Sequence, residues 1–195
     1  MGILSALRGG GLRSPHSIRH NGKRLSEILA QHAEFVRGNP NGVRADLAEA
    51  DLSRANLERA NLAYAGLRSA NLERASLREA KLGSADLSKA YLRNADLRKM
   101  DATEANFSGA DLTEAQVGGA ELFRADLRRA ILRRADFGAT NFRDAEIQGA
   151  DFEGASLKTA ILRETKLEGV DLSRADISTA LLPRGYAAAG QASNG

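Results

Sequence analysis

The chain has 195 residues, and its 28 Lys and Arg residues against 25 Asp and Glu residues give a net charge of +3. It contains no cysteine, which excludes a disulfide framework, a cysteine nucleophile and a cysteine-based metal site. Tryptophan is absent, aromatic residues make up only 5% of the chain, and no apolar run approaches the roughly 18 residues of a membrane-spanning helix.

Residues 1–24 are rich in glycine, carry several basic side chains and contain no acid. This composition predicts a flexible N-terminal segment. The start, MGILSA, departs from a myristoylation signal because Ala6 stands where Ser or Thr is needed. A plain leader is therefore favoured, with membrane contact by this arm as the alternative. His16 and His20 have a spacing that suits a metal site on a helix, but no third ligand is near and no metal is predicted.

Residues 25–44 are predicted to form a capping helix and a turn. Apolar side chains recur at helical spacing over residues 25–37, Gly38 suits the position after a helix, and Pro40 forbids its continuation. The predicted capping residues are Leu25, Ile28, Leu29, Phe35 and Val36. His32 lies on or near the same face and is expected to be packed or half exposed. A helix with one apolar face directly before a repeat is expected to cover the open end of that repeat.

From Ala45 to Leu182 the sequence repeats every five residues without a slip. Of the 28 units, 27 carry Leu, Ile, Val or Phe at the centre, and Ala102 is the exception. The residue two before the centre is Ala in 24 of the 28 units, with Met100, Thr140, Thr165 and Val170 as the exceptions. The residue just before the centre is usually Asp or Asn, and the two residues after the centre are polar, charged or glycine.

A period of five fits neither a helix nor a strand. It suits one short extended piece followed by a tight corner, so four units would close a square coil of 20 residues. Coils that pair as strands do would rise by about 4.8 Å each, or about 34 Å for seven coils. The centre and Ala side chains are expected to fill the shaft. In one unit Met100 and Ala102 exchange the large and small positions, so the Met side chain is expected to occupy volume that Ala vacates.

These units resemble the pentapeptide repeat family, whose pattern is A(D/N)LXX. The resemblance covers residues 45–184 and implies an all-β solenoid, a right-handed quadrilateral β-helix of about seven four-sided coils behind the N-terminal capping helix. The handedness is implied by the resemblance alone. Some proteins of this family are dimeric, acidic mimics of DNA that occupy the DNA groove of DNA gyrase and protect the enzyme from quinolones or toxins. A bacterial, cytoplasmic protein is also implied, in keeping with the missing signal sequence and cysteines.

At the C-terminal end Pro183 lacks an N–H and is expected to end the ladder, with residues 185–195 as a flexible tail. No second capping helix is apparent, so the last coil is expected to present an open edge. Ile161 and Leu181, 20 residues apart, occupy the outward position that usually holds Asp or Asn. With Leu182 they predict a homodimer through the C-terminal coils, which the resemblance also implies; tolerated surface residues on a monomer are the alternative.

The repeat region carries 21 basic and 23 acidic residues, a net charge of −2. A near-neutral rod is a poor imitation of a duplex, which has one charge per about 1.7 Å. The candidate partner-binding basic patch consists of Arg124, Arg128, Arg129, Arg133 and Arg134. An ordinary solvated face is the favoured alternative for these arginines. No aromatic residues alternate with them, so direct nucleic-acid binding is not expected.

The sequence predicts no catalytic residue and no cofactor. A filled shaft leaves no pocket for a Ser–His–Asp site, and the many Asp residues form surface ladders and not an isolated pair. The predicted function is a non-enzymatic, rigid protein-interaction or scaffold module with an unidentified protein partner. The alternative is a DNA-mimicking protein that binds DNA gyrase or another topoisomerase and confers quinolone or toxin resistance.

Overall fold

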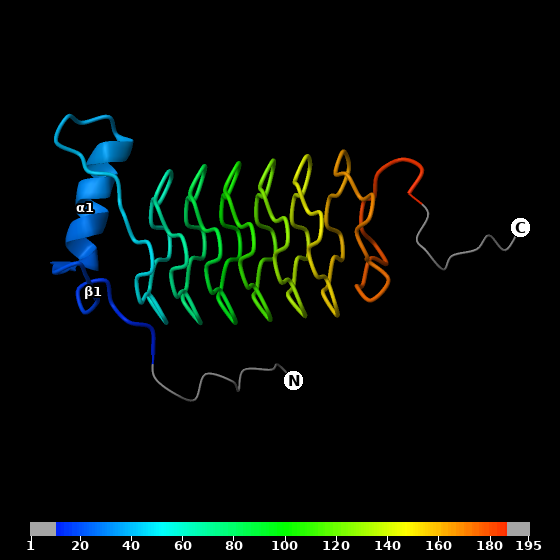
Figure 1. Ribbon diagram of the computed structural model, residues 1–195, viewed down its shortest axis with the longest axis horizontal. Helices are drawn as coiled ribbons and strands as arrows, with labels where there is room; N and C mark the ends of the chain where they lie inside the picture. Colours follow the sequence, from blue (N-terminus) through cyan, green and yellow to red (C-terminus); the bar gives the residue numbers. More distant parts are fainter. Residues whose placement is uncertain (1–10, 187–195) are drawn as a thin grey trace, which may run out of the picture.

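A computed structural model describes residues 11–186, which form a rod of stacked coils with one helix at its N-terminal end (Figure 1). Its regular elements are two short strands, β1 (Arg19–His20) and β2 (Lys23–Arg24), and one helix, α1 (Leu25–Val36). Residues 1–10 and 187–195 lie outside the described part of the chain. The MGILSA start and most of the predicted C-terminal tail therefore fall outside it as well.

Residues 13–18, part of the segment predicted to be flexible, are attached to the rod. The N–H of Arg13 donates to the C=O of Arg54 at 2.6 Å, and the N–H of Asn56 donates to the C=O of Arg13 at 2.9 Å. Arg13 thereby adds one parallel bridge in front of the first coil. Ile18 is buried in the hydrophobic core. The prediction of flexibility through residue 24 is corrected here, because a backbone bridge and a buried side chain anchor this stretch.

The hairpin of β1 and β2 leads directly into α1. Asn21 and Gly22 close the hairpin with φ values of 48° and 79°, the two positive angles that a type I′ turn requires. The backbone N–H of Arg24 then donates to the carboxylate of Glu27 at 3.1 Å, which satisfies a donor at the start of the helix. Gly38, with φ of 78°, follows the helix in the left-handed conformation common after a C-terminus.

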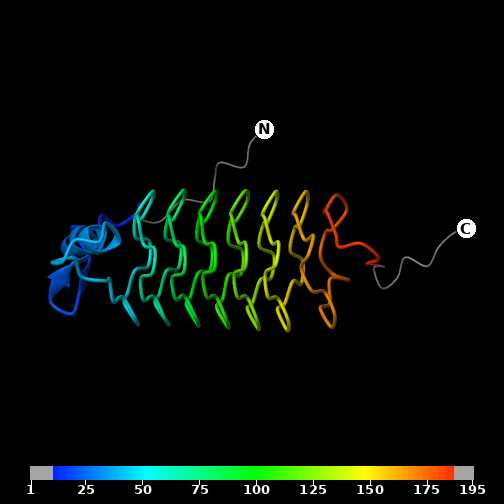
Figure 2. The same ribbon diagram turned by 90° about the horizontal axis from the view of Figure 1, so that it is seen from above.

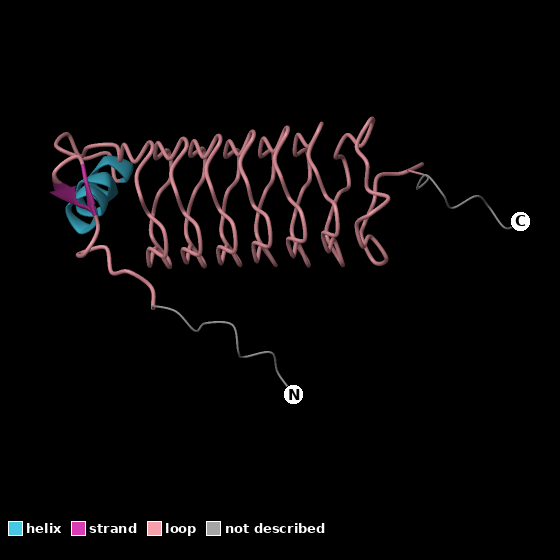
Figure 3. Ribbon diagram, turned by 60° about the horizontal axis from the view of Figure 1, so that its bottom comes forward, coloured by secondary structure: helices cyan, strands magenta, loops and turns pink. Residues whose placement is uncertain are grey.

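Helix α1 lies across the N-terminal end of the coils (Figures 1 and 3). Among the predicted capping residues, Leu25 is buried, Ile28 and Leu29 pack partly buried against the core, and Phe35 and Val36 are half-buried. His32, which was expected to be packed or half exposed, is fully buried. The helix therefore shields the open end of the first coil from water.

The coils stack through single bridging residues, which is why Figure 3 draws them as loops. With two exceptions near the C-terminal end, the residue just before a centre pairs in parallel with the residue 20 positions further on, from Asp46 with Gly66 to Ile161 with Leu181. Figure 2 shows the resulting even succession of coils from a second direction. This pairing confirms the prediction that four units make one coil.

A β-turn forms the corner after each centre. In the first unit the N–H of Ala50 donates to the C=O of Leu47 at 3.2 Å, and Glu49 between them has φ of 59°. The same positive φ recurs at the second position after nearly every centre. A type II turn has this angle at its third residue and favours glycine there. Five corners accordingly use glycine: Gly109, Gly119, Gly149, Gly154 and Gly169.

The shaft is filled by the centre residues and the small residues two before them, as predicted. Met100 and Ala102, the exchanged pair, are both buried. Three phenyl rings at centre positions, those of Phe137, Phe142 and Phe152, lie with centroids 5.2 to 6.4 Å apart. Three of the few aromatic residues of the chain thus form one cluster in the shaft.

The ladder is interrupted in front of the last coil. Among the described residues, no bridge joins Glu146 to Lys166 or Asp151 to Asp171, whereas the other two sides of the coil keep their bridges. The regular five-residue sequence pattern did not predict this gap. On these two sides the regular bridges to the last coil are missing, and the N–H of Gly154 donates to the C=O of Arg174 at 2.9 Å.

Val170 lies at this interruption, where it replaces the small Ala two before a centre. Extra methyl groups in a close-packed shaft force the backbone to move. Thr140 and Thr165 occupy the same position in other units, but their hydroxyl groups are accommodated by donating to backbone C=O groups, at 3.0 Å for Thr140 and 2.6 Å for Thr165. A valine side chain has no such partner.

Candidate functional site

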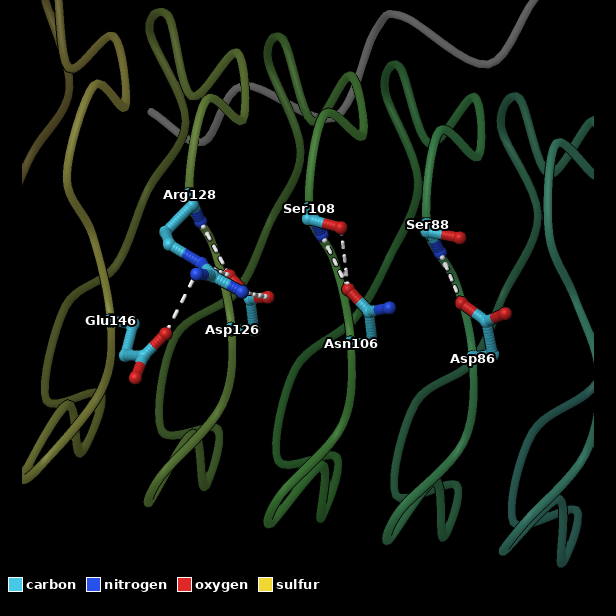
Figure 4. A network of polar contacts seen from close by, with 7 residues as sticks. All are labelled: Asp86, Ser88, Asn106, Ser108, Asp126, Arg128 and Glu146. Atoms are coloured by element: carbon cyan, nitrogen blue, oxygen red, sulfur yellow. Dashed lines mark hydrogen bonds and ion pairs between the residues drawn. The ribbon is translucent and has the colours of Figure 1, made fainter.

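The outward Asp and Asn residues have a structural role in the turns. The Oδ1 atom of Asp86 accepts the backbone N–H of Ser88 at 3.0 Å, and that of Asn106 accepts the N–H of Ser108 at 2.9 Å (Figure 4). The same bond recurs sixteen times. It is an Asx-turn, which needs a side-chain oxygen and not a charge.

Several of these carboxyl groups have a lowered pKa, which favours their ionised form. A hydrogen bond from Arg128 is the main reason why the pKa of Asp126 is lowered, and burial opposes it. Hydrogen bonds from Ser173 likewise lower the pKa of Asp171. Wherever a carboxyl pKa is clearly shifted in residues 11–186, the shift is downward. A general acid would need a raised pKa, so these groups are suited to accepting hydrogen bonds.

The five arginines of the predicted basic patch are distributed over three sides of the rod. Residues 20 apart lie on the same side, and successive units lie on successive sides. Arg124 therefore belongs to one side, Arg128 and Arg129 to the next, and Arg133 and Arg134 to the third. A flat partner surface would meet only part of this set.

Most of these arginines are ion-paired with acids of neighbouring coils. The pairs join Arg124 to Glu104 and Asp144, Arg128 to Asp126 and Glu146, Arg133 to Asp151 and Glu153, and Arg134 to Glu114. Arg129 is exposed and has no ion pair within residues 11–186. Reading along the chain finds only Asp126 between the arginines, whereas the coil period places acids 20 residues away beside them. Exposed ion pairs of this kind contribute about 0–1 kcal/mol each.

One side of the rod carries the acids that a DNA mimic would need, and their charge is partly neutralised. Arg128 contacts Asp126 at 2.7 Å and Glu146 at 3.1 Å, so one guanidinium bridges two successive coils (Figure 4). The position between Asp86 and Asp126 on this side is the neutral Asn106. The side therefore lacks the unbroken negative charge of a phosphate backbone.

The C-terminal end of the rod is apolar and, within residues 11–186, incompletely covered. Ile161 and Leu181 are bridged to each other; Ile161 is half-buried and Leu181 is exposed. Leu182 is half-buried beneath them. The partly buried residues that pack at this end are Val170, Ala175, Ile177, Ala180, Leu182 and Tyr186. The structure thus brings the three residues of the predicted dimer interface together.

His32 connects α1 to the first repeat unit. Its Nδ1 atom accepts the backbone N–H of Ala45 at 3.0 Å, and its ring stacks on Phe35 at 5.7 Å. Burial is the main cause that lowers the pKa of His32; the backbone of Ala63 opposes this shift and Arg44 adds to it. Because Nδ1 is an acceptor, the other ring nitrogen, Nε2, carries the proton of the neutral ring, and it is buried without a hydrogen-bonded acceptor among the described residues.

A shallow groove of about 470 Å³ lies on another side of the rod. It is lined by Arg93, Asp111, Thr113, Ile131, Arg133, Arg134, Asp151 and Glu153. Sequence reasoning missed it, although Tyr91 and Ile131 break the Asp/Asn pattern on this same side.

Within residues 11–186 no three His, Asp or Glu side chains gather as a metal site, and no helix is both long and apolar enough to cross a membrane.

Comparison with known proteins identifies the repeat. A family model described as pentapeptide repeats matches in eight copies, over residues 43–79, 80–116, 120–158 and 148–178. A solved structure of HetL, a pentapeptide repeat protein involved in heterocyst differentiation regulation from the cyanobacterium Nostoc sp. strain PCC 7120, is 25% identical, with 79% of this chain and 98% of that chain covered and a TM-score of 0.38.

Two further solved structures are similar at lower identity. QnrB1, a plasmid-mediated fluoroquinolone resistance protein, is 23% identical, with 72% of this chain and 71% of that chain covered and a TM-score of 0.47. Rfr23, a pentapeptide repeat protein from the cyanobacterium Cyanothece 51142, is 22% identical, with 57% and 80% covered and a TM-score of 0.33. Comparison with curated proteins finds no match.

Proposed function

Since the chain belongs to the pentapeptide repeat family, we propose that it is a non-enzymatic, rigid protein-interaction module that acts as a scaffold in the bacterial cytoplasm. The proposed rod is a right-handed quadrilateral β-helix of about seven coils, capped by α1. The proposal rests on how the side chains are distributed. Apolar residues fill the interior, and outward acids accept hydrogen bonds in the turns and form ion pairs. A molecule built in this way recognises partners by its surface.

The proposed assembly is a homodimer through the C-terminal coils. Ile161, Leu181 and Leu182 lie together beside the open end of the shaft, and exposed apolar surface of this kind favours association. The variant Ile161→Asp with Leu181→Asp is expected to change the mass measured by light scattering from dimer to monomer. Tyr64→Asp, at an exposed position away from this end, is the matched control. A wild-type chain that is monomeric at tens of micromolar protein would contradict the dimer.

A gyrase-binding DNA mimic is the second candidate. The side that carries Asp86, Asp126 and Glu146 is the observation in its favour, because these acids follow one another along the rod. The pairing of Asp126 and Glu146 with Arg128 weighs against it, as does the near-zero net charge of the repeat region. The interaction module is therefore the preferred function.

Partner capture with side-specific variants tests the interaction module. Four arginines occupy the same position of the repeat unit on the four different sides: Arg68, Arg133, Arg98 and Arg163. Each is reversed to Glu in a separate bait, and the proteins retained from an extract of the source cells are quantified by mass spectrometry. We expect that at least one protein is retained by the wild type and by three of the variants, and that the fourth variant does not retain it. Equal retention by all baits, or retention of nothing specific, would contradict the proposal.

A further inference from the structure

Two large apolar side chains stand on one side of the rod where the repeat normally carries Asp or Asn. Tyr91 is 54% exposed and Ile131 is 39% exposed. They are connected through Asp111 by successive bridges, so they lie two coils apart in one row along the rod axis. Neither side chain can accept the N–H two residues further on, as Asp and Asn do elsewhere. Each position therefore lacks the turn hydrogen bond and exposes apolar surface to water. Neither feature stabilises the fold.

The groove described above runs beside this row. One of its walls consists of Asp111, Ile131 and Asp151, and the other of Arg93, Thr113, Arg133 and Glu153, in each case residues 20 apart. Because both walls repeat along the axis of the rod, the groove is parallel to that axis. It accepts a segment that lies along the rod and not across it.

The acids of the groove are recessed and its arginines project. The Asp111 side chain is 20% exposed against 53% for Arg93, and that of Asp151 is 35% exposed against 54% for Arg133. Asp111 is held down by the backbone N–H and the hydroxyl of Thr113, at 2.9 and 2.5 Å. The guanidinium groups of Arg93 and Arg133 are consequently more exposed to a partner than the acids beside them.

These guanidinium groups retain donors for a partner. Arg133 donates one hydrogen bond within the described chain, from Nε to Asp151 at 2.5 Å. Arg93 and Arg134 approach their acids only at 3.8 and 3.6 Å, beyond hydrogen-bond distance. Guanidinium groups with unused N–H donors form strong, often bidentate hydrogen bonds with anionic oxygen atoms such as those of carboxylates. The rim of the groove therefore favours an acidic segment.

The spacing of the two apolar residues selects a helix. Two coils separate Tyr91 from Ile131, a distance of about 9.6 Å along the axis. Side chains two turns apart on a helix are about 10.5 Å apart, which is close to this value, whereas side chains on one face of a strand recur every ~6.7 Å or ~13 Å. We propose that this side of the rod docks an amphipathic helix of a partner protein, apolar along its centre and lined with carboxylates on the edge that meets Arg93 and Arg133. The inference rests on the proposed interaction module and narrows it to one side and one class of partner.

A display library of single-helix peptides is the probe for this proposal. The library is selected on the full wild-type chain and depleted on the double variant Tyr91→Asn with Ile131→Asp, which restores the repeat pattern and should fold at least as well. We expect the enriched peptides to carry apolar residues seven apart and Glu or Asp along one flank. Their affinity should fall about tenfold or more for this double variant and for Arg93→Glu with Arg133→Glu. Arg68→Glu, on the adjacent side, is the matched control and should change the affinity less than about twofold.

Enriched peptides that bind the pattern-restored variant as well as the wild type would overturn the proposal, and so would a preference for basic or extended peptides. An absence of enrichment would overturn it too. The interaction module itself fails by a different result, the absence of any side-dependent partner in the capture experiment. A partner lost only with Arg68→Glu, Arg98→Glu or Arg163→Glu would reject this docking side while leaving the module in place.

Discussion

The backbone N–H of Ala45 donates to Nδ1 of His32 at 3.0 Å, so a buried side chain of α1 holds the first residue of the first repeat unit. A nitrogen that accepts this bond must be unprotonated. The attachment of the capping helix to the rod therefore depends on the neutral form of one imidazole.

A pH dependence of stability follows from this bond. Burial lowers the pKa of His32 from its usual 6.5, so between 6.5 and the lower folded value the unfolded chain binds more protons than the folded chain. The contribution of His32 to stability is complete above pH 6.5 and is lost as the pH falls through the folded pKa. The protection of the Ala45 amide from hydrogen exchange, corrected for the intrinsic pH dependence of exchange, should decrease as the pH falls through this window.

The variant His32→Asn separates this effect from the titration of surface acids. An Asn oxygen can take the place of Nδ1 as the acceptor but does not titrate. The difference in unfolding free energy between wild type and variant should therefore change below pH 6.5 and be constant above it. Parallel pH profiles for the two proteins would contradict a role for His32.

Met100→Ala tests the exchanged pair in the shaft. Met100 and Ala102 are both buried, so truncation of Met100 leaves a cavity and should cost about 2–5 kcal/mol in the free energy of unfolding. Adding Ala102→Leu restores the regular pattern and should recover most of that loss in denaturant titrations. Strictly additive losses in the double variant would show that the two side chains do not share the same space.

Asp101 tests the role of the Asx-turn. Its Oδ1 atom accepts the N–H of Thr103 at 3.2 Å and the hydroxyl of Thr103 at 2.8 Å. Asp101→Ala should lower the free energy of unfolding by about 0.5–1.5 kcal/mol, because the bonds to Thr103 are lost. Asp101→Asn keeps the oxygen and should stay within about 0.5 kcal/mol of the wild type. A loss for Asn as large as that for Ala would mean that the charge, and not the acceptor oxygen, is what matters at this position.

Val170→Ala tests the cause of the interrupted ladder. The small side chain should let the last coil close on the previous one, so that the amides of Ile147 and Phe152 exchange more slowly than in the wild type. The amide of Phe107, which already donates to Asp126 at 2.7 Å, is the internal reference and should not change. Unchanged exchange at Ile147 would assign the interruption to another residue.

Much of the rod could be predicted from sequence because its repeat is strict. A period of five with alternating large and small apolar residues determines which side chains are buried and which residues lie 20 positions apart. The attachment of Arg13 and the burial of Ile18 could not be predicted, because one bridge and one apolar residue make no pattern. The gap near Val170 depends on how much volume the packed shaft can accept, which is a three-dimensional property.

The surface was predicted less well for a different reason. The acids that neutralise Arg128 and Arg134, such as Glu146 and Glu114, lie 18 or 20 residues away in the sequence. Applying the coil period to the charged residues would have found them, as it would have placed Tyr91 and Ile131 in one row. Local runs of charge are a poor guide where each residue has neighbours in the coils above and below.

A gyrase supercoiling assay, with and without a quinolone, is the most direct test of the role of the outward acids. It distinguishes a protein whose acids stabilise turns and form ion pairs from a protein whose acids imitate DNA. Because Arg128 partly neutralises Asp126 and Glu146 and the repeat region is almost uncharged, we expect neither inhibition of supercoiling nor protection from the drug at up to tens of micromolar protein. Inhibition or protection at micromolar protein, abolished when Asp86 and Asp126 are changed to Asn, would contradict this expectation and assign the acidic side to the gyrase groove.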